Sequence, residues 1–303
     1  MNKDKTILKT LLLGSFFASL SAMLGGSTFV FTRYVVDSID PFTLSFLRYG
    51  LTGLILFLLS ISVYMNKKFA KADLIPMCFL GLAMITLFPN FMALGLEHTT
   101  AARAGLLYAT MPLCTIIIAY FFNIEKITLN KSLAVLLAIL GVSFCMSERV
   151  DNNFQDTLKG DFLMMIGVLS ASCFTVFSGK YLKKYGNIPV MIFVILIGTI
   201  LNLIISMIFG NSIISLLEIN KFEAAALLML IIPGGVVMMY CWGKALQLIS
   251  PTQAAISLGF NPLSAILLGS IILNEEITFK VGVGFISILI AIILANWKSK
   301  IKA

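Results

Sequence analysis

The stretch LEHTTAARAGLLYATMPLCTIIIAYFFNIEKIT, residues 96–128, returns at a constant offset of 150 as LQLISPTQAAISLGFNPLSAILLGSIILNEEIT, residues 246–278. Pro112 falls on Pro262, and the motif Glu-x-Ile-Thr closes both copies. A similarity that recurs at a fixed interval is the sequence signature of a duplicated architecture. The chain is therefore expected to consist of two related halves.

The composition is that of a membrane protein. Of the 303 residues, 59% are apolar and 12% are charged, and the mean hydropathy is +1.00. An average soluble domain has about 25% charged residues. The net charge of +8 comes from basic residues scattered singly near the ends of apolar segments, so it does not form the basic patch that nucleic-acid binding requires.

Ten apolar segments are long enough to cross a bilayer, which takes about 20 residues of helix. Backbone groups in hydrocarbon must be hydrogen-bonded within their own segment, which predicts helices and an all-α integral membrane fold. The first segment is too long for the apolar core of a signal peptide and is expected to be retained. The ten segments are 10–32, 42–65, 74–96, 101–122, 131–147, 161–182, 188–210, 223–246, 252–273 and 280–297.

The basic residues predict the orientation. With the N-terminus in the cytoplasm, fifteen lysines fall inside and six basic residues outside, which places both termini in the cytoplasm. The inside set is Lys3, Lys5, Lys9, Lys67, Lys68, Lys71, Lys126, Lys131, Lys180, Lys183, Lys184, Lys244, Lys298, Lys300 and Lys302, and the outside set is Arg33, Arg103, Arg149, Lys159, Lys221 and Lys280.

The number of segments per half predicts that the halves are inverted. Residues 10–147 and 161–297 each hold five segments, and an odd number forces the second half to enter the membrane upside down. Inverted repeats with a site near the membrane midplane are a recurrent plan of secondary transporters.

In this plan and in its repeated motifs the whole chain resembles the EamA family of the drug/metabolite transporter superfamily. The motifs are Ala101 to Pro112 with Thr252 to Pro262, Glu125-Lys-Ile-Thr128 with Glu275-Glu-Ile-Thr278, Leu140-Gly-Val142 with Gly282-Val-Gly284, and Asp40 to Arg48. One departure is that many members carry Trp-Gly in the first helix of each repeat, where this chain has Leu24-Gly-Gly-Ser and Ala171-Ser-Cys-Phe.

The resemblance implies a carrier that moves small metabolites, amino acids or drugs across the bacterial inner membrane, most often outward, without ATP hydrolysis. The chain has no P-loop motif, and no cofactor or metal is expected. The expected partners are a small-molecule substrate, the lipid bilayer and protons as a candidate coupling ion, in a monomer or weak dimer. Two alternatives remain: an uptake or exchange carrier for a nucleotide-like metabolite, and, more distantly, an intramembrane lipid-modifying enzyme.

Six polar or aromatic side chains inside the segments are candidates for substrate binding. Asn261 and Asn90 each adjoin a proline, and their amides need partners in an apolar setting. An inward-facing aromatic ring offers stacking or cation–π contact to an amine. Arg48 is a candidate counter-ion for a carboxylate or phosphate, although outward snorkelling or pairing with an aspartate is the preferred interpretation. The six candidates are Tyr108, Asn261, Asn90, Trp242, Tyr240 and Arg48.

Prolines and glycines mark the candidate gating points. Pro112 and Pro262 occupy equivalent places, and each removes a backbone donor, which predicts a bend around a cavity. Pro233, Gly234 and Gly235 weaken their helix and predict a hinge.

Two kinds of titratable residue are interpreted as structural rather than as part of the transport site. Glu125 and Glu275 recur at loop positions and are expected to cap the amides of the helix that follows each one. His98 is the single histidine and is expected at the surface.

Overall fold

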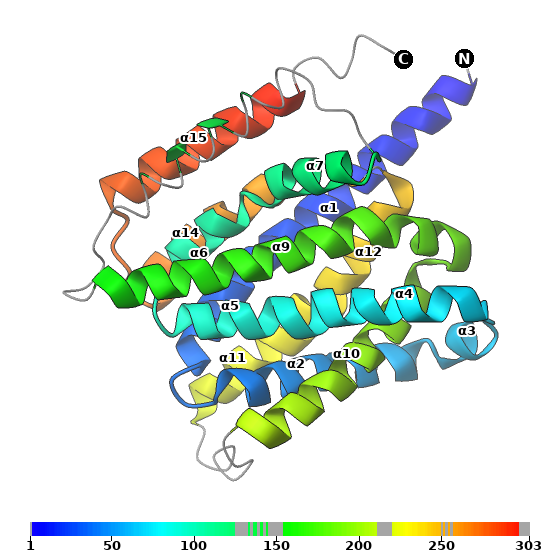
Figure 1. Ribbon diagram of the computed structural model, residues 1–303, viewed down its shortest axis with the longest axis horizontal. Helices are drawn as coiled ribbons and strands as arrows, with labels where there is room; N and C mark the ends of the chain where they lie inside the picture. The colour runs from blue at the N-terminus through cyan, green and yellow to red at the C-terminus, as the bar shows by residue number, and fades with distance from the viewer. Residues whose placement is uncertain are drawn as a thin grey trace.

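The computed structural model describes residues 2–124, 154–210, 220–249 and 257–296, together with single positions between 133 and 144 and at 251 and 254. In these ranges all regular structure is helical (Figure 1). The first half contains α1 (Asn2–Val35), α2 (Pro41–Leu59), α3 (Ile61–Met65), α4 (Lys71–Gly81), η1 (Leu82–Leu87), α5 (Phe88–Leu96), α6 (Ala101–Tyr108) and α7 (Met111–Phe121). The second half contains α9 (Phe154–Tyr185), α10 (Asn187–Phe209), α11 (Lys221–Ile231), η3 (Ile232–Val237), α12 (Met238–Leu248), η4 (Ser257–Gly259), α14 (Phe260–Ile272) and α15 (Phe279–Asn296).

Seven stretches of the described chain are long and apolar enough to cross a bilayer. They are Thr10–Val35, Pro41–Leu59, Lys71–Leu96, Ala101–Phe121, Gln155–Tyr185, Asn187–Phe209 and Lys221–Leu248, and the shorter apolar helices Ser257–Ile272 and Phe279–Ala291 follow. The prediction of an all-α membrane fold is confirmed. The fifth predicted segment, 131–147, lies almost wholly outside the described residues, as does Glu125.

The helix ends follow from local sequence. Asp40 caps α2, since its carboxylate accepts hydrogen bonds from the amides of Phe42 and Thr43 at 3.1 and 3.0 Å, and Pro41 needs no such partner. Asn220 and Glu223 form a capping box at the start of α11. Asn123 and Asn274 adopt φ values of 55° and 53° just after α7 and α14, because asparagine tolerates the left-handed conformation that stops a helix.

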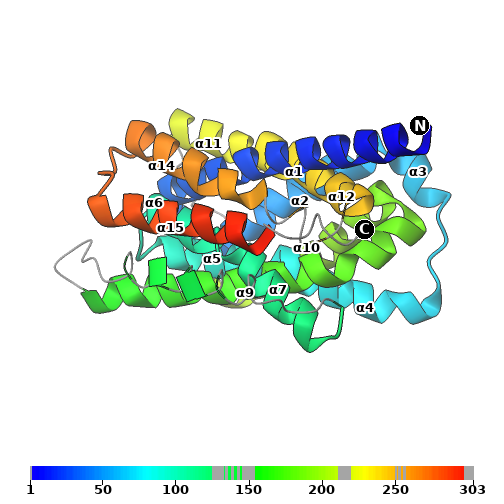
Figure 2. The same ribbon diagram turned by 90° about the horizontal axis from the view of Figure 1, so that it is seen from above.

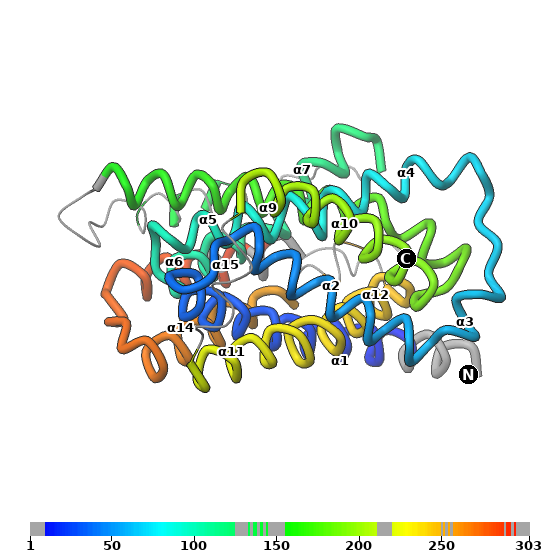
Figure 3. The backbone as a smooth tube through the Cα atoms, turned by 90° about the horizontal axis from the view of Figure 1, so that it is seen from below, coloured from blue at the N-terminus to red at the C-terminus, as the bar shows by residue number. Residues whose placement is uncertain are grey.

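The two halves are inverted and interleaved. The end of α1 and the start of α9 line one and the same cavity, so these two helices run in opposite directions. The first helix of each half packs on the other half: α1 on α12 and α14, and α9 on α5 and α7. Figure 2 and Figure 3 show the same exchange from above and below. Two more pairs join the halves, since α2 packs on α10 and α6 packs on α14. Each half thus buries its apolar faces against the other.

Two π-helical segments extend the internal repeat beyond the similar stretches of sequence. The segments η1 and η3 cover residues 82–87 and 232–237, which are again 150 residues apart. The hinge predicted at Pro233, Gly234 and Gly235 falls within η3. The equivalent η1 has no proline or glycine, so the sequence patterns did not reveal it.

Charged residues separate between the two ends of the bundle. At the end where α9 and α12 finish lie Lys67, Lys68, Lys71, Lys180, Lys183, Lys184 and Lys244. At the opposite end lie Asp37, Asp40, Glu97, Asp156, Glu223, Glu275 and Glu276, together with Arg33, Lys159 and Lys221. We call these the basic end and the acidic end. Which end faces the cytoplasm stays a prediction.

Candidate functional site

A narrow cavity lies at the centre of the bundle, between the two halves. The side chains that line it come from α1, η1, α5, α6, α12, η4 and α14. They are Ser21, Gly25, Thr28, Phe29, Met84, Phe88, Tyr108, Met238, Met239, Trp242, Leu258 and Asn261. Its volume is about 20 Å³, which is close to the room that one water molecule needs. In this conformation the cavity is therefore too small to hold a metabolite.

Asn261 is the polar centre of this cavity. The residue is 1% exposed, and its Oδ1 has no hydrogen-bond partner among the described residues. Two of the cavity's hydroxyls already have partners, because Ser21 donates to the carbonyl of Met238 and Thr28 to that of Gly25. A buried acceptor without a partner costs about 1–3 kcal/mol, so Asn261 is the group in this cavity with most to gain from a ligand that donates a hydrogen bond.

Two glycines bring Asn261 into place. A Cβ added to Gly25 would lie 2.8 Å from Asn261 Nδ2, and one added to Gly26 would lie 2.2 Å from the Asn261 carbonyl oxygen. Helix α1 therefore approaches α14 so closely that only glycine fits at these positions. The Gly-Gly pair that replaces the common Trp-Gly thus has a packing role here.

Aromatic rings form the opposite wall. The ring of Tyr108 lies between those of Phe29 and Phe88, with centroid distances of 5.4 and 5.3 Å. Trp242 is buried on α12 and lines the same cavity. Of the six predicted binding residues, the structure brings Tyr108, Trp242 and Asn261 together. None of the residues that line the cavity is charged.

Arg48 and Asn90 lie elsewhere, each beside a π-helical segment. Arg48 is 2% exposed, and its Nη2 donates to the Gly234 carbonyl in η3 at 3.0 Å. The predicted outward snorkelling is therefore wrong, because a carbonyl inside the protein provides the partner. Asn90 Nδ2 donates to the carbonyl of Thr86 in η1 and to Oδ1 of Asn202, at 2.8 and 2.9 Å.

The prolines stand at helix interruptions. Pro112 lies in the first turn of α7, after a break at Ala109 and Thr110, and Pro262 lies in the first turn of α14, just after the 3₁₀ segment η4. The predicted bends are present, whereas a gating role stays a prediction. Tyr240 is 37% exposed near the basic end and does not line the central cavity.

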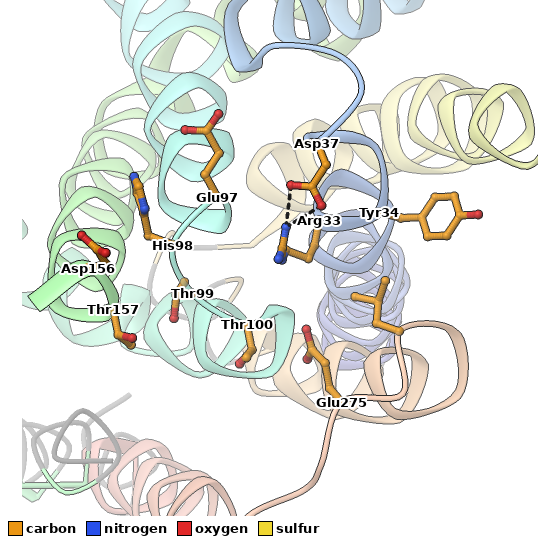
Figure 4. Close-up of a pocket in the computed structure, with 11 residues that line it drawn as sticks. Arg33, Tyr34, Asp37, Glu97, His98, Thr99, Thr100, Asp156, Thr157 and Glu275 are labelled. Carbon is orange, nitrogen blue, oxygen red and sulfur yellow. Dashed lines mark hydrogen bonds and ion pairs between the residues drawn. The ribbon is translucent and has the colours of Figure 1, made fainter. Parts of the chain in front are cut away.

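A second, larger cavity of about 610 Å³ opens at the acidic end (Figure 4). Arg33 and Asp37 form an ion pair at 3.1 Å on its wall. Burial raises the pKa of the Glu97 carboxyl, with smaller opposing effects from His98 and Lys159. His98 is half-buried on the same wall.

Glu275 caps a helix, but a different one from the helix expected. Its two carboxylate oxygens accept hydrogen bonds from the amides of Ala101 and Ala102, at 2.9 and 3.1 Å. Ala101 and Ala102 begin α6, in the other half of the chain, whereas the sequence predicted a cap on the following helix, α15. The fold places the loop after α14 beside the start of α6, so the nearest free amides belong to α6.

The sequence did not predict a buried ion pair that lies near this cavity. Arg103 and Asp161 are 1% and 0% exposed and pair through Nη2 and Oδ2. Thr99 adds a hydrogen bond to Asp161 at 3.0 Å. Arg103 was counted among the outside basic residues, and in the structure it lies in the first turn of α6, where Asp161 of α9 is its partner. Only the contact between the halves reveals this pair.

The fold and the central cavity define the chain as a polytopic helical membrane protein with a narrow cavity between two inverted halves. The model of the EamA-like transporter family matches residues 12–147 and again residues 158–297. The chain belongs to this family.

Curated relatives with transporter names are similar over nearly the whole chain. An uncharacterized transporter of Archaeoglobus fulgidus is 26% identical over 285 residues, which cover 92% of this chain and 96% of the relative. The uncharacterized transporter YoaV of Bacillus subtilis is 24% identical, with 90% and 92% covered. A solved crystal structure shares the fold with a TM-score of 0.69 at 15% identity, covering 97% of this chain and 98% of the other.

Proposed function

We propose that the protein is a secondary carrier that exports small metabolites, foremost amino-acid-like compounds, by alternating access through the central cavity. The observation that carries this proposal is the central cavity, which Tyr108, Trp242 and Asn261 line together between the inverted halves. A site at the interface of two inverted repeats can open to either face when the repeats rock against each other.

The chemistry of the cavity favours a substrate with an apolar body and a hydrogen-bond donor. Asn261 Oδ1 would accept from that donor. The rings of Tyr108 and Trp242 offer stacking, and they attract an amine through their π faces. The nucleotide-like alternative receives no support here, because none of the lining residues is a cation that would neutralise a phosphate.

Binding requires the cavity to open, since about 20 Å³ cannot hold a metabolite. The segments η1 and η3 and the interruptions before Pro112 and Pro262 are the places where the surrounding helices depart from α-helical geometry. Departures of this kind recur at functional sites and hinges. We assign gating to these four places.

We place the protein in the bacterial inner membrane with both termini and the basic end in the cytoplasm, in keeping with the excess of lysine there. The two repeats would be residues 10–147 and 161–297. The protein is proposed to act as a monomer or weak dimer and to need no cofactor. Protons are the candidate coupling ion.

Transport by reconstituted protein tests the proposal. Inside-out and right-side-out proteoliposomes would receive a labelled pool of amino acids and nucleosides, with and without a pH gradient. Accumulation of one component identifies the substrate class, and dependence on the gradient identifies proton coupling. If nothing moves in vesicles that hold folded protein, and no member of the pool raises the unfolding temperature, the proposed substrate class is wrong.

Variants locate the site. Tyr108→Ala and Asn261→Ala should abolish transport while expression and stability in detergent stay nearly unchanged. Phe260→Ala is the matched control, because this neighbour on α14 is exposed on the outside of the bundle. Transport at the wild-type rate in both cavity variants would remove these residues from the site.

A further inference from the structure

The basic end holds a third cavity that the carrier function does not use. It measures about 440 Å³ and lies between the end of α3, the start of α10 and the last turns of α12. Its polar lining includes Asn66, Lys67, Tyr185, Asn187, Lys244 and Gln247. We call it the basic cavity.

Two lysines give this cavity an uncompensated positive charge. The Nζ atom of Lys244 donates to Oε1 of Gln247 at 3.1 Å, a neutral partner. In the part of the chain that the structure describes, neither Lys67 nor Lys244 forms an ion pair with a carboxylate. Asp73, which also lies at this end, is already paired with Lys184 at 2.6 Å and accepts a hydrogen bond from Tyr185.

The start of α10 adds to this charge. The helix runs for 23 residues from Asn187, and Gly186 at its N-cap, with φ 93°, provides no side-chain cap. The first amides of a helix and its dipole attract anions. Gly186, Asn187, Ile188 and Pro189 all line the basic cavity.

Asn187 supplies a buried acceptor at the same place. The residue is 6% exposed, and its Nδ2 donates to the carbonyl of Tyr240 at 2.9 Å. Its Oδ1 has no partner among the described residues. The α12 backbone packs on this oxygen at Gly243, where a Cβ would lie 1.9 Å from it. Asn187 thus joins the start of α10 to α12 at the wall of the basic cavity.

An apolar groove is built on two of the same elements. Phe46, Leu47, Leu51, Leu54 and Phe57 on α2 and Leu196 on α10 line a groove of about 520 Å³. Helices α2 and α10 pack side by side (Figure 1). Ile188 in the basic cavity precedes Leu196 by about two turns of α10. The charged cavity and the apolar groove thus follow one another along the outside of this helix pair.

We propose that the basic cavity binds the phosphate of an anionic phospholipid, whose acyl chains lie in the groove between α2 and α10. Lys67, Lys244 and the amides at the start of α10 would hold the phosphate. Basic pockets between membrane helices bind such headgroups on the cytoplasmic side of other membrane proteins.

Thermal unfolding of the full-length protein in detergent tests this site. Phosphatidylglycerol should raise the unfolding midpoint in a saturable manner, whereas phosphatidylcholine should not. Lys67→Gln/Lys244→Gln should weaken phosphatidylglycerol binding about 30-fold, at ~1 kcal/mol for each lysine near a membrane anion. The matched control Lys68→Gln/Lys71→Gln removes two lysines from the same end but outside the cavity, and it should bind as the wild type does.

Further arms separate the sources of the phosphate. If inorganic phosphate or short-chain phosphatidylglycerol protects as well as the long-chain lipid does, the groove contributes nothing and the lipid assignment is wrong. Unchanged lipid affinity in Lys67→Gln/Lys244→Gln, or an equal loss in the control, would overturn the site. If the glutamine variant does not fold, Lys67→Arg/Lys244→Arg should keep the stabilisation by phosphatidylglycerol. High salt should abolish this stabilisation in the wild-type protein. A stabilisation that salt leaves unchanged would contradict the proposal.

Discussion

At the scale of single residues, the central cavity depends on Asn261 and on the glycines that admit it. The amide is buried, and its oxygen has no hydrogen-bond partner among the described residues. Burying such an oxygen costs free energy, and a role in substrate binding would explain why the residue is kept. Gly25 keeps the amide in place, since any side chain there would meet Nδ2. The position of the Asn261 amide on α14 therefore depends on the lack of a side chain at Gly25 on α1.

Gly25→Ala should impair transport. The new Cβ would lie 2.8 Å from Asn261 Nδ2, so the amide must shift, and such overpacking costs about 1–3 kcal/mol. Transport assays and unfolding midpoints would be compared with those of Gly282→Ala, where a Cβ meets nothing within 4 Å. Equal behaviour of the two variants would contradict the close fit of α1 on α14.

At the scale of elements, side chains from α2 and α10 hold the two π-helical segments. Thr52 donates to the Ile231 carbonyl at 3.2 Å, and Arg48 donates to that of Gly234. Asn202, which is 150 residues after Thr52, donates to the Ile85 carbonyl in η1 at 2.8 Å. A π-helical turn disturbs the regular backbone pairing, and in hydrocarbon the freed carbonyls need donors within the protein. Thr52 and Asn202 thus occupy equivalent positions in the two halves, and each donates a hydrogen bond although the side chains differ.

The pair Asn90–Asn202 should contribute measurably to stability. We expect Asn90→Ala and Asn202→Ala each to lower the free energy of unfolding, with a coupling energy of about 0.6–1.7 kcal/mol in a double-mutant cycle. The reason is that each substitution leaves the other asparagine without the hydrogen bond between the two amides. The cycle would be measured by unfolding in mixed micelles. Strict additivity of the two substitutions would show that the hydrogen bond at 2.9 Å adds nothing.

At the scale of the whole molecule, the interleaved halves form one unit. The ion pair Arg103–Asp161 and the cap from Glu275 to Ala101 both join residues of different halves. The long packing of α1 on α12 and of α9 on α5 does the same. Either half alone would expose these faces, so the halves are expected to fold together.

Breaking the buried ion pair should destabilise the protein strongly. Arg103→Met or Asp161→Asn alone leaves one buried group without its partner, which costs about 3–5 kcal/mol. The double variant Arg103→Met/Asp161→Leu should recover most of this loss, because neither charge then remains. Unfolding free energies of the three variants test this expectation. A double variant as unstable as the sum of the singles would contradict it.

The proposed orientation is tested by labelling. In a cysteine-free background, Lys68→Cys should react with an impermeant thiol reagent from the cytoplasmic side only, and Asp156→Cys from the outer side only. The two positions lie at the basic and acidic ends. The reverse pattern would place the termini outside.

The sequence by itself determined the helical membrane class, the duplication at an offset of 150 and, through five segments per half, the inversion. The membrane class and the number of segments follow from local hydropathy. The duplication follows from matching residues, such as Pro112 and Pro262. The sequence also placed Tyr108, Trp242 and Asn261 among six candidates, since an aromatic ring or an amide inside a membrane segment can bind a substrate.

Only the tertiary structure decided which candidates meet. Arg48 and Asn90 serve the π-helical segments, and Tyr240 lies near the basic end. The pair Arg103–Asp161 likewise appears only in the folded chain. The physical reason is that the deciding contacts, Arg48 with Gly234, Asn90 with Asn202 and Arg103 with Asp161, join the two halves. A side chain on one helix finds its partner on a helix far along the chain, and no local pattern records which faces will touch.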